Sequence, residues 1–312
     1  MINFRFHIVS LIAVFLALAI GVVMGYGVLG QPTVDTLQQR IDTVERRANQ
    51  IRSENGTLRA EQSRLEEVLG ASNDFSVAGR LAGITTLPIA ARGIDEARIG
   101  ATVQLARKAG GVVPGVLWLE AKWNLSTAAD ATTLADLVGT TSTARNAVRE
   151  AGLKALAVRL ADGPSVTARV DLLTALGDAG FVSTSTVDGQ AFDLASITWK
   201  VQWAWVAGGT KGQVDWPRVL APLTRDLVVG NVSVVASDTW AQAAGGPERG
   251  VDFAVIRQDS VTGPKVTTVD DLDRVDGPLA VVLGLSARTR GAVGHYGSGD
   301  GAKSVLPAWW VE

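Results

Sequence analysis

Residues 8–29 read IVSLIAVFLALAIGVVMGYGVL, a run of 22 residues without one charged side chain. As a helix rising about 1.5 Å per residue, the run is roughly 33 Å long, which matches the hydrocarbon core of a bilayer. A cleaved signal peptide is the alternative, but its apolar region is usually about 7 to 15 residues long. Gly25, Gly27 and Gly30 keep that alternative open. We expect an uncleaved transmembrane helix at 8–29, preceded by a cytoplasmic N-terminus at 1–7.

Small side chains recur at every fourth position of this run. Such spacing places them on one helical face, where a second helix backbone can approach closely. Small residues are also common on helices that face only lipid, so the pattern has a second explanation. We expect a packing face made of Ala13, Ala17, Gly21 and Gly25.

A heptad pattern follows Pro32 and predicts a coiled coil over 33–70. All d positions are apolar, whereas Asn55 and Gln62 occupy two of the a positions. Polar residues at a positions lower the stability of a coiled coil but favour one register. We expect a parallel homodimer and a stalk of roughly 54 Å. The a positions are Val34, Ile41, Ala48, Asn55, Gln62 and Leu69, and the d positions are Leu37, Val44, Ile51, Leu58 and Leu65.

The charges beside this seam do not commit it to self-association. In a parallel homodimer two g–e′ pairs attract and two repel, so a helix from another protein could compete for the seam. The four pairs are Arg40 with Glu45, Arg47 with Arg52, Glu54 with Arg59, and Glu61 with Glu66.

The distribution of basic residues does not by itself orient the span. Arg5 precedes it, whereas Arg40, Arg46 and Arg47 follow within about 20 residues, which counts against a cytoplasmic N-terminus. Large domains, however, translocate largely regardless of charge. The absence of Cys is compatible with an exposed envelope domain. We expect the N-terminus inside and residues 78–312 outside.

The remaining residues have the composition of a globular domain. The whole chain is 47% hydrophobic and 19% charged with a net charge of −2, which does not indicate nucleic-acid binding. After a linker at 70–77, a strand, a helix and a strand at 81–87, 94–109 and 112–119 predict a parallel βαβ unit, and hence a mostly parallel α/β domain. Further strands are expected at 181–187, 197–206 and 232–236, and helices at 130–138, 143–160, 166–179, 216–227 and 278–290, the last with a buried strand at 279–285 as its alternative.

Alternation within 197–206 places three tryptophans on one strand face. The face is either part of the core or an exposed aromatic platform for a partner or a glycan. Its members are Trp199, Val201, Trp203 and Trp205.

The motifs of common enzyme classes are missing from the sequence. The chain has two histidines, His7 and His295, and no Cys, so a nucleophile would have His295 as its one plausible base. GSGDGAKS at 297–304 lacks the Gly before Lys and the following helix of a phosphate-binding loop. The carboxylates at 270, 271, 273 and 276 suit either a hard cation or solvated turns. We expect neither catalysis nor a cofactor.

Two terminal segments carry a family resemblance. INFRFHIVSLIAVFLALAIGVVMG at 2–25 and TVDDLDRVDGPLAVVLGLSARTRGAVGHYGSGDGAKSVLP at 268–307, with the heptads between them, resemble the actinobacterial MctB/SteB family. The resemblance implies a cell-membrane protein with one span and an external α/β domain. It also implies a functional loop that comprises Asp270, Asp271, His295, Tyr296 and Gly297.

The resemblance implies two different roles. One is copper export, or the outer-membrane channel of the family label. The other is a complex with a SteA-like membrane protein that regulates a peptidoglycan hydrolase during cell separation. Copper ions select thiolate, thioether and imidazole ligands, and the chain offers Met1, Met24, His7 and His295. Because only His295 lies in the domain, we expect a dimeric scaffold rather than a copper site.

Overall fold

The computed structural model describes residues 4–27, 31–166, 169–186, 192–240 and 248–307, without the side chains of 26–34. The chain divides into two compact units, Met1–Glu67 and Val68–Glu312. Helix α1, Phe4–Gly27, contains the stretch Phe4–Gly25 with a mean hydropathy of 2.8, which is long and apolar enough to cross a membrane. Residues 28–29 of the predicted span lie outside the described residues.

Helix α2, Gln31–Val77, is continuous over 47 residues. The predicted linker at 70–77 is therefore wrong, because the helix continues until Val77 becomes fully buried against the domain core. A turn at 78–83 follows, in which Leu81 is also fully buried. Leu81, the first residue of the strand predicted at 81–87, is thus a core residue of a turn, whereas Leu87 belongs to the strand that begins at Thr86.

One mixed sheet is formed within the described part of the second unit, in the order β3-β2-β1-β4-β5-β6-β7. Neighbouring strands are parallel except β2 and β3, so the predicted mostly parallel α/β domain is confirmed. The strands are β1 Thr86–Ala91, β2 Val116–Leu119, β3 Val182–Ser185, β4 Trp203–Gly209, β5 Ser233–Thr239, β6 Thr267–Val269 and β7 His295–Tyr296.

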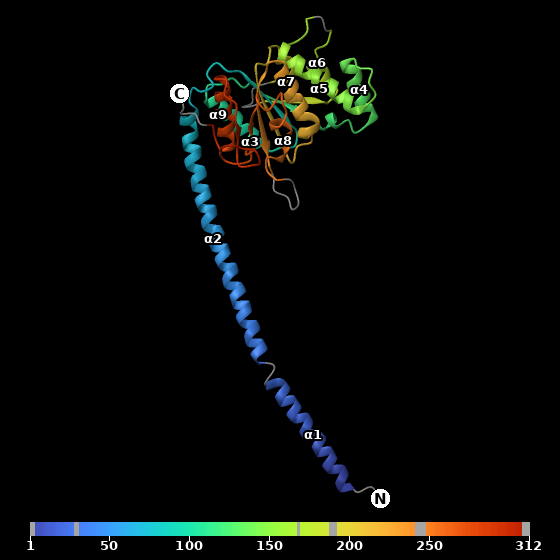
Figure 1. Cartoon of the computed structure of the whole chain (residues 1–312), viewed down its shortest axis with the longest axis vertical. Coiled ribbons are helices and arrows are strands. Elements are labelled where there is room, and N and C mark those ends of the chain that lie inside the picture. Colours follow the sequence, from blue (N-terminus) through green and yellow to red (C-terminus); the bar gives the residue numbers. More distant parts are fainter. Residues whose placement is uncertain (1–3, 28–30, 167–168, 187–191, 241–247, 308–312) are drawn as a thin grey trace. The chain divides into compact units, whose positions relative to one another are not determined.

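Helices cover both faces of this sheet. Helices α3 and α9 pack together, while α5 packs against α4 and α7, and Figure 1 shows the two groups on opposite sides of the strands. Asp95 caps α3 by accepting hydrogen bonds from the amides of Ala97 and Arg98. The helices are α3 Glu96–Lys108, α4 Ala128–Val138, α5 Arg145–Asp162, α6 Leu172–Asp178, α7 Ala221–Val229, α8 Ala254–Arg257 and α9 Gly277–Thr289, with short helical turns at η1 Ala121–Asn124, η2 Leu194–Ser196, η3 Trp216–Leu220 and η4 Val251–Phe253.

Several predicted boundaries were wrong. Strand β1 begins at Thr86 and contains Pro88, one residue before its pairing with β2 begins at Ile89. Strand β4 begins at Trp203 rather than 197, because 194–196 form a helical turn and 197–202 run without strand pairing. Helix α6 begins at Leu172 rather than 166, after the capping residue Asp171. The last residue of the strand predicted at 181–187 lies outside the described residues.

The predicted tryptophan face belongs mainly to the core. Trp205 is 2% exposed and Val201 is 3% exposed, whereas Trp199 and Trp203 are partly buried. The indole of Trp205 donates a hydrogen bond to Ser237 Oγ at 2.7 Å, which satisfies its buried N–H. The predicted helix at 278–290 is confirmed as α9, and its alternative as a strand is wrong.

Candidate functional site

The candidate site lies where β5, β6 and β7 end. These strands run parallel, so their carboxyl ends share one edge of the sheet. Ligands of open α/β sheets bind at that edge. Asp238 lies near the end of β5, Asp270 directly follows β6, and Gly297 directly follows β7.

Asp270 is the centre of this edge and is fully buried. Its Oδ1 accepts hydrogen bonds from the amides of Ser298 and Gly299, each at 3.0 Å. Its Oδ2 accepts one from Nη2 of Arg257 at 2.8 Å. Gly297 has φ +124°, and a Cβ there would clash with Oδ1 of Asp270. The close approach of this loop to the carboxylate therefore requires glycine.

A chain of hydrogen bonds joins this carboxylate to the histidine of the domain. Arg257 Nε donates to Thr268 Oγ1 at 3.0 Å, and that hydroxyl is 3.0 Å from Nδ1 of His295. The pKa of His295 lies below its usual value because of burial and the nearby positive charges of Arg257 and Lys303. Both effects disfavour the charged form of the imidazole.

A second arginine binds two further carboxylates. Arg249 forms a bidentate pair with Asp273 at 2.7 and 2.8 Å, and its Nη1 is 2.9 Å from Asp271 Oδ1. Burial alone would raise the pKa of Asp273, but hydrogen bonds from Arg249 and the Trp240 amide lower it overall. The guanidinium also lies 4.7 Å from the ring centre of Trp240. These contacts tie 270–273 to the segment that precedes η4.

Two carboxyl groups at this edge are less well compensated. Burial raises the pKa of Asp238 to about 7, although the Trp216 indole donates to its Oδ1 at 2.8 Å. Burial also raises the pKa of Asp271, whose Oδ2 has no hydrogen-bond partner. Asp238 is therefore the group at this edge that titrates near neutral pH.

The arrangement is that of an ion-pair lock, meaning Arg249 with Asp271 and Asp273, and Arg257 with Asp270. Its guanidinium and amide donors occupy the positions that a cation would need around Asp270 and Asp273. In the ranges that the structure covers, no three His, Cys, Asp or Glu side chains are grouped to hold a metal ion. The lock fixes the loops after three strands.

The structure brings the five predicted loop residues together. The Asp270 amide donates a hydrogen bond to the Tyr296 carbonyl at 3.1 Å. Thr268 on β6 lies opposite His295 on β7 in the parallel pairing of these strands. Their functional role stays a prediction. The sequence did not indicate Asp238, Arg249 or Arg257, and the strand-end rule would have found only Asp238.

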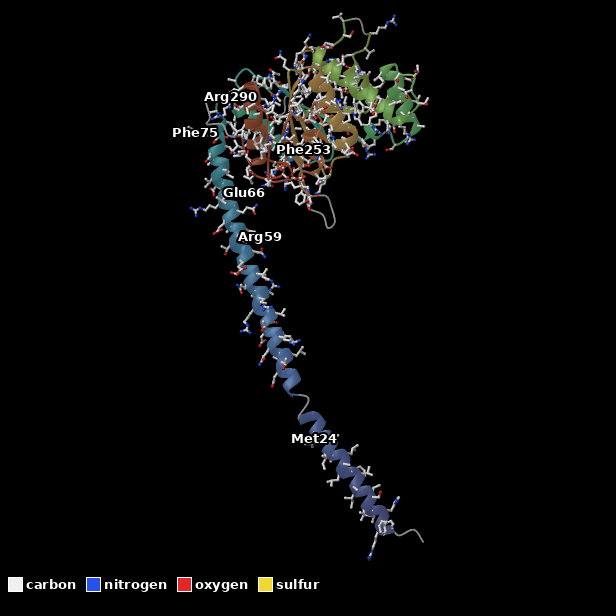
Figure 2. The ribbon with its side chains drawn as sticks, in the orientation of Figure 1. Met24, Arg59, Glu66, Phe75, Phe253 and Arg290 are labelled. Carbon is white, nitrogen blue, oxygen red and sulfur yellow. The ribbon has the colours of Figure 1, made fainter. Side chains whose placement is uncertain are left out.

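In the described part of the single chain, the predicted packing face of α1 and most of the predicted seam of α2 are exposed. Nothing lies within 4 Å of a Cβ built at Gly21 or Gly25. Figure 2 shows side chains projecting from α2, including Arg59 and Glu66. The described d residues are exposed by 56% to 64%: Leu37, Val44, Ile51, Leu58 and Leu65. Ile41 is 50% exposed, Asn55 and Gln62 are exposed, Ala48 and Leu69 are partly buried, and the side chain of Val34 lies outside the described part.

These features define a class of protein: an N-terminal apolar helix, a long exposed helix with an apolar seam, and an open α/β domain with an ion-pair lock at its strand ends. The chain belongs to the MctB family, since the model for "Copper transport outer membrane protein, MctB" matches residues 1–307. The family description and the apolar helix together indicate membrane association.

Relatives in mycobacteria extend along the whole chain. Proteins named "Copper transporter MctB" from Mycobacterium bovis and Mycobacterium tuberculosis are 27% identical to it over 326 aligned positions. The alignment covers 98% of this chain and 99% of each relative. The relatives therefore share its full length.

Proposed function

We propose that the chain is a non-enzymatic envelope scaffold that dimerises through α2 and acts by binding a protein partner there. The observation that carries the proposal is the exposed apolar seam of α2. Five large d side chains, each more than half exposed, repeat along this helix. Burying one such side chain contributes about 1.5–3 kcal/mol, so a partner helix has a substantial driving force.

The proposed topology has the N-terminus in the cytoplasm, α1 across the membrane and the α/β domain outside. It rests on the apolar helix, on the Cys-free composition and on the family resemblance. The small face of α1 would then pack against α1 of the second copy, continuing the dimer into the membrane.

The partner we propose is a SteA-like membrane protein, with a peptidoglycan hydrolase as the regulated enzyme. Two of the four g–e′ pairs repel in the homodimer, so a partner helix with complementary charges at these positions could compete with the second copy. In the single chain, Glu66 already accepts a hydrogen bond from Gln62 at 2.9 Å on its own helix. Because Glu66 would face Glu61 of the second copy, exchange of the partner helix there gives up no favourable ion pair.

The test is capture of a SteA-like protein by full-length chain in native membranes. Leu37→Asp combined with Leu58→Asp places charge at two d positions and should abolish capture. The circular dichroism of the α/β domain should remain unchanged. Capture that survives both substitutions would show that α2 is not the recognition element.

Copper transport is the second candidate, and the names of the family and of its relatives favour it over hydrolase regulation. Copper would then be the transported substrate. Of the soft ligands in this chain, His7 and Met24 lie on α1 in the first unit (Figure 2 labels Met24), whereas His295 on β7 lies in the second unit. Imidazole and thioether groups from other copies or from a partner would have to complete a site.

A Cu(I) titration of the full chain under reducing conditions separates the two candidates. The scaffold proposal expects no tight stoichiometric binding. Tight binding that His295→Ala removes would instead support copper transport by this chain.

A further inference from the structure

A groove of about 550 Å³ lies at the amino ends of β1, β2 and β4. These strands are parallel, so the segments that lead into them meet at one edge of the sheet. The lining residues come from three such segments, 83–85, 112–114 and 199–203. The volume is within the usual range for small-molecule sites. The ion-pair lock, in contrast, lies at carboxyl ends of strands.

Main-chain hydrogen bonds hold the three segments in place. The Val112 amide donates to the Ile84 carbonyl at 2.8 Å, and the Thr86 amide donates to the Val112 carbonyl at 2.9 Å. The Gln202 carbonyl accepts from the Ser233 amide at 2.8 Å. The groove is therefore formed before any ligand binds, as is usual for ligand sites.

Two members of the tryptophan face predicted from the sequence, Trp199 and Trp203, line this groove. Both are partly buried, so part of each indole is open to solvent. The indoles of Trp118, Trp205 and Trp216 each donate a hydrogen bond to an acceptor within the domain. In the ranges that the structure describes, Trp199 and Trp203 form no such bond. Each therefore offers apolar ring surface and an N–H donor to a ligand.

The polar groups beside the two tryptophans favour a ligand with many hydroxyls. Gln202 and Thr85 also line the groove, and both side chains are exposed. The face of an aromatic ring is negative, so it attracts the weakly positive C–H groups on one face of a sugar ring. Sugar hydroxyls both donate and accept hydrogen bonds, as do the amide of Gln202 and the hydroxyl of Thr85. A saccharide thus matches both the aromatic and the polar part of the groove.

A proline-rich peptide is another ligand that aromatic grooves bind. Proline rings can pack against indoles, but proline has no N–H and offers only a carbonyl acceptor. The acceptor oxygens of Gln202 and Thr85 would find no donor on such a peptide. The mixture of donors and acceptors therefore favours the saccharide.

The charge of the groove favours an acid group on that saccharide. Among the described residues of the lining, Lys200 is the one charged side chain, and no carboxylate is present. Because Lys200 is exposed, its attraction for a carboxylate is screened by water and changes affinity only a few-fold.

We propose that this groove binds a saccharide that carries a carboxylate. Sugar rings stack on Trp199 and Trp203, the hydroxyls bind Gln202 and Thr85, and the carboxylate lies near the ammonium group of Lys200. The site is independent of the proposed dimerisation through α2. Neither the family description nor the names of the relatives assign a saccharide to this chain.

The experiment uses the full chain in detergent micelles with fluorine-labelled tryptophan, so that the nine indoles report separately by fluorine NMR. Trp199→Phe and Trp203→Phe assign the two signals of the groove. The probe is the disaccharide of N-acetylglucosamine and N-acetylmuramic acid, which carries a lactyl carboxylate. We expect saturable shifts of the Trp199 and Trp203 signals with a dissociation constant on the order of 1 mM. The signal of the buried Trp205 should not move.

Two further disaccharides test the role of the carboxylate. Diacetylchitobiose has the same sugar backbone without the lactyl group and should bind roughly threefold more weakly. A disaccharide of glucuronic acid and N-acetylglucosamine carries its carboxylate on the ring and should also bind more tightly than the neutral compound. The tighter of the two acidic compounds identifies the kind of acidic glycan that the groove prefers.

Variants of the groove and a matched control complete the test. Trp199→Ala should weaken binding roughly tenfold, because a stacked ring is lost. Gln202→Ala changes only an exposed side chain and should weaken binding roughly fivefold, even if Trp199→Ala folds poorly. Lys200→Gln should remove the preference for the acidic disaccharides. Lys211 is also exposed but follows β4 at its other end, so Lys211→Gln should change nothing.

Three results would overturn the proposal. The groove is not a saccharide site if none of the three disaccharides gives a saturable shift of its two signals. Tighter binding of a decaproline peptide at the same signals would make it a peptide site. Equal affinities for acidic and neutral disaccharides would mean that Lys200 does not select a carboxylate.

Discussion

Arg257 Nη2 donates a hydrogen bond to Oδ2 of the fully buried Asp270 at 2.8 Å. The guanidinium side chain is itself 7% exposed, so both charges are withdrawn from water. Removing one partner of such a pair is more damaging than removing both, because an isolated buried charge remains. The pair therefore locks the loop after β6 to helix α8.

Arg257→Met should lower the free energy of unfolding by about 3–5 kcal/mol, because Asp270 loses its counter-charge. Urea denaturation of the full chain in detergent measures the change. Arg225→Met is the matched control, since Arg225 is 52% exposed in its pair with Asp259 and should cost about 0–1 kcal/mol. Adding Asp270→Asn to Arg257→Met should recover part of the loss, and no recovery would mean that the charge is not the cause.

Gly297→Ala should destabilise the protein by about 2–5 kcal/mol. Two costs add up, because alanine is strained at the positive φ of this residue and its Cβ clashes with Asp270. Gly291 offers a control, because it also has positive φ but no atom lies within 4 Å of its built Cβ. Gly291→Ala should cost only about 1–2 kcal/mol. Equal losses in thermal or urea unfolding would show that the contact with Asp270 is unimportant.

Asp238→Asn should change how stability depends on pH. The pKa of Asp238 is raised from 3.8 to about 7 by burial, so between these values the folded state holds a proton that the unfolded state has released. Stability from this group is present at low pH and is lost as pH rises through about 7. The loss is on the order of 4 kcal/mol. Asparagine stays neutral, so the variant should lack this decline.

Urea midpoints of wild type and Asp238→Asn between pH 4 and pH 8 provide the measurement. Relative to wild type, the variant should gain stability as pH rises from about 4 to 7, and the difference between the two proteins should become constant above about pH 7. Parallel profiles across the whole range would mean that Asp238 is ionised in the folded state.

Local patterns in the sequence predicted part of this fold well. Asp95 in the first turn and the basic residues Arg107 and Lys108 in the last turn indicated α3. Pro278 at the start and Gly291 after the end indicated α9, whereas the apolar run at 279–285 suggested the alternative strand. These signals depend on neighbours a few residues away, so no tertiary information was needed.

The ion-pair lock could not be predicted from local patterns. Strands β6 and β7 have three and two residues, too few to show an alternating pattern, and they form only because longer strands precede them in the sheet. Arg249 and Asp273 are 24 residues apart, and their pairing depends on that sheet. Only the family resemblance indicated that 270–271 and 295–297 act together.

The most direct test of the dimeric scaffold uses the absence of cysteine from the chain. In a parallel coiled coil, equivalent d positions face each other within disulfide range, whereas f positions point outward. Leu58→Cys at d and Ala60→Cys at f therefore form a matched pair, on either side of Arg59, which Figure 2 labels. Under mild oxidation in native membranes, the scaffold account predicts covalent dimers for Leu58→Cys and few for Ala60→Cys. Equal cross-linking of the two variants, or none in either, would contradict it.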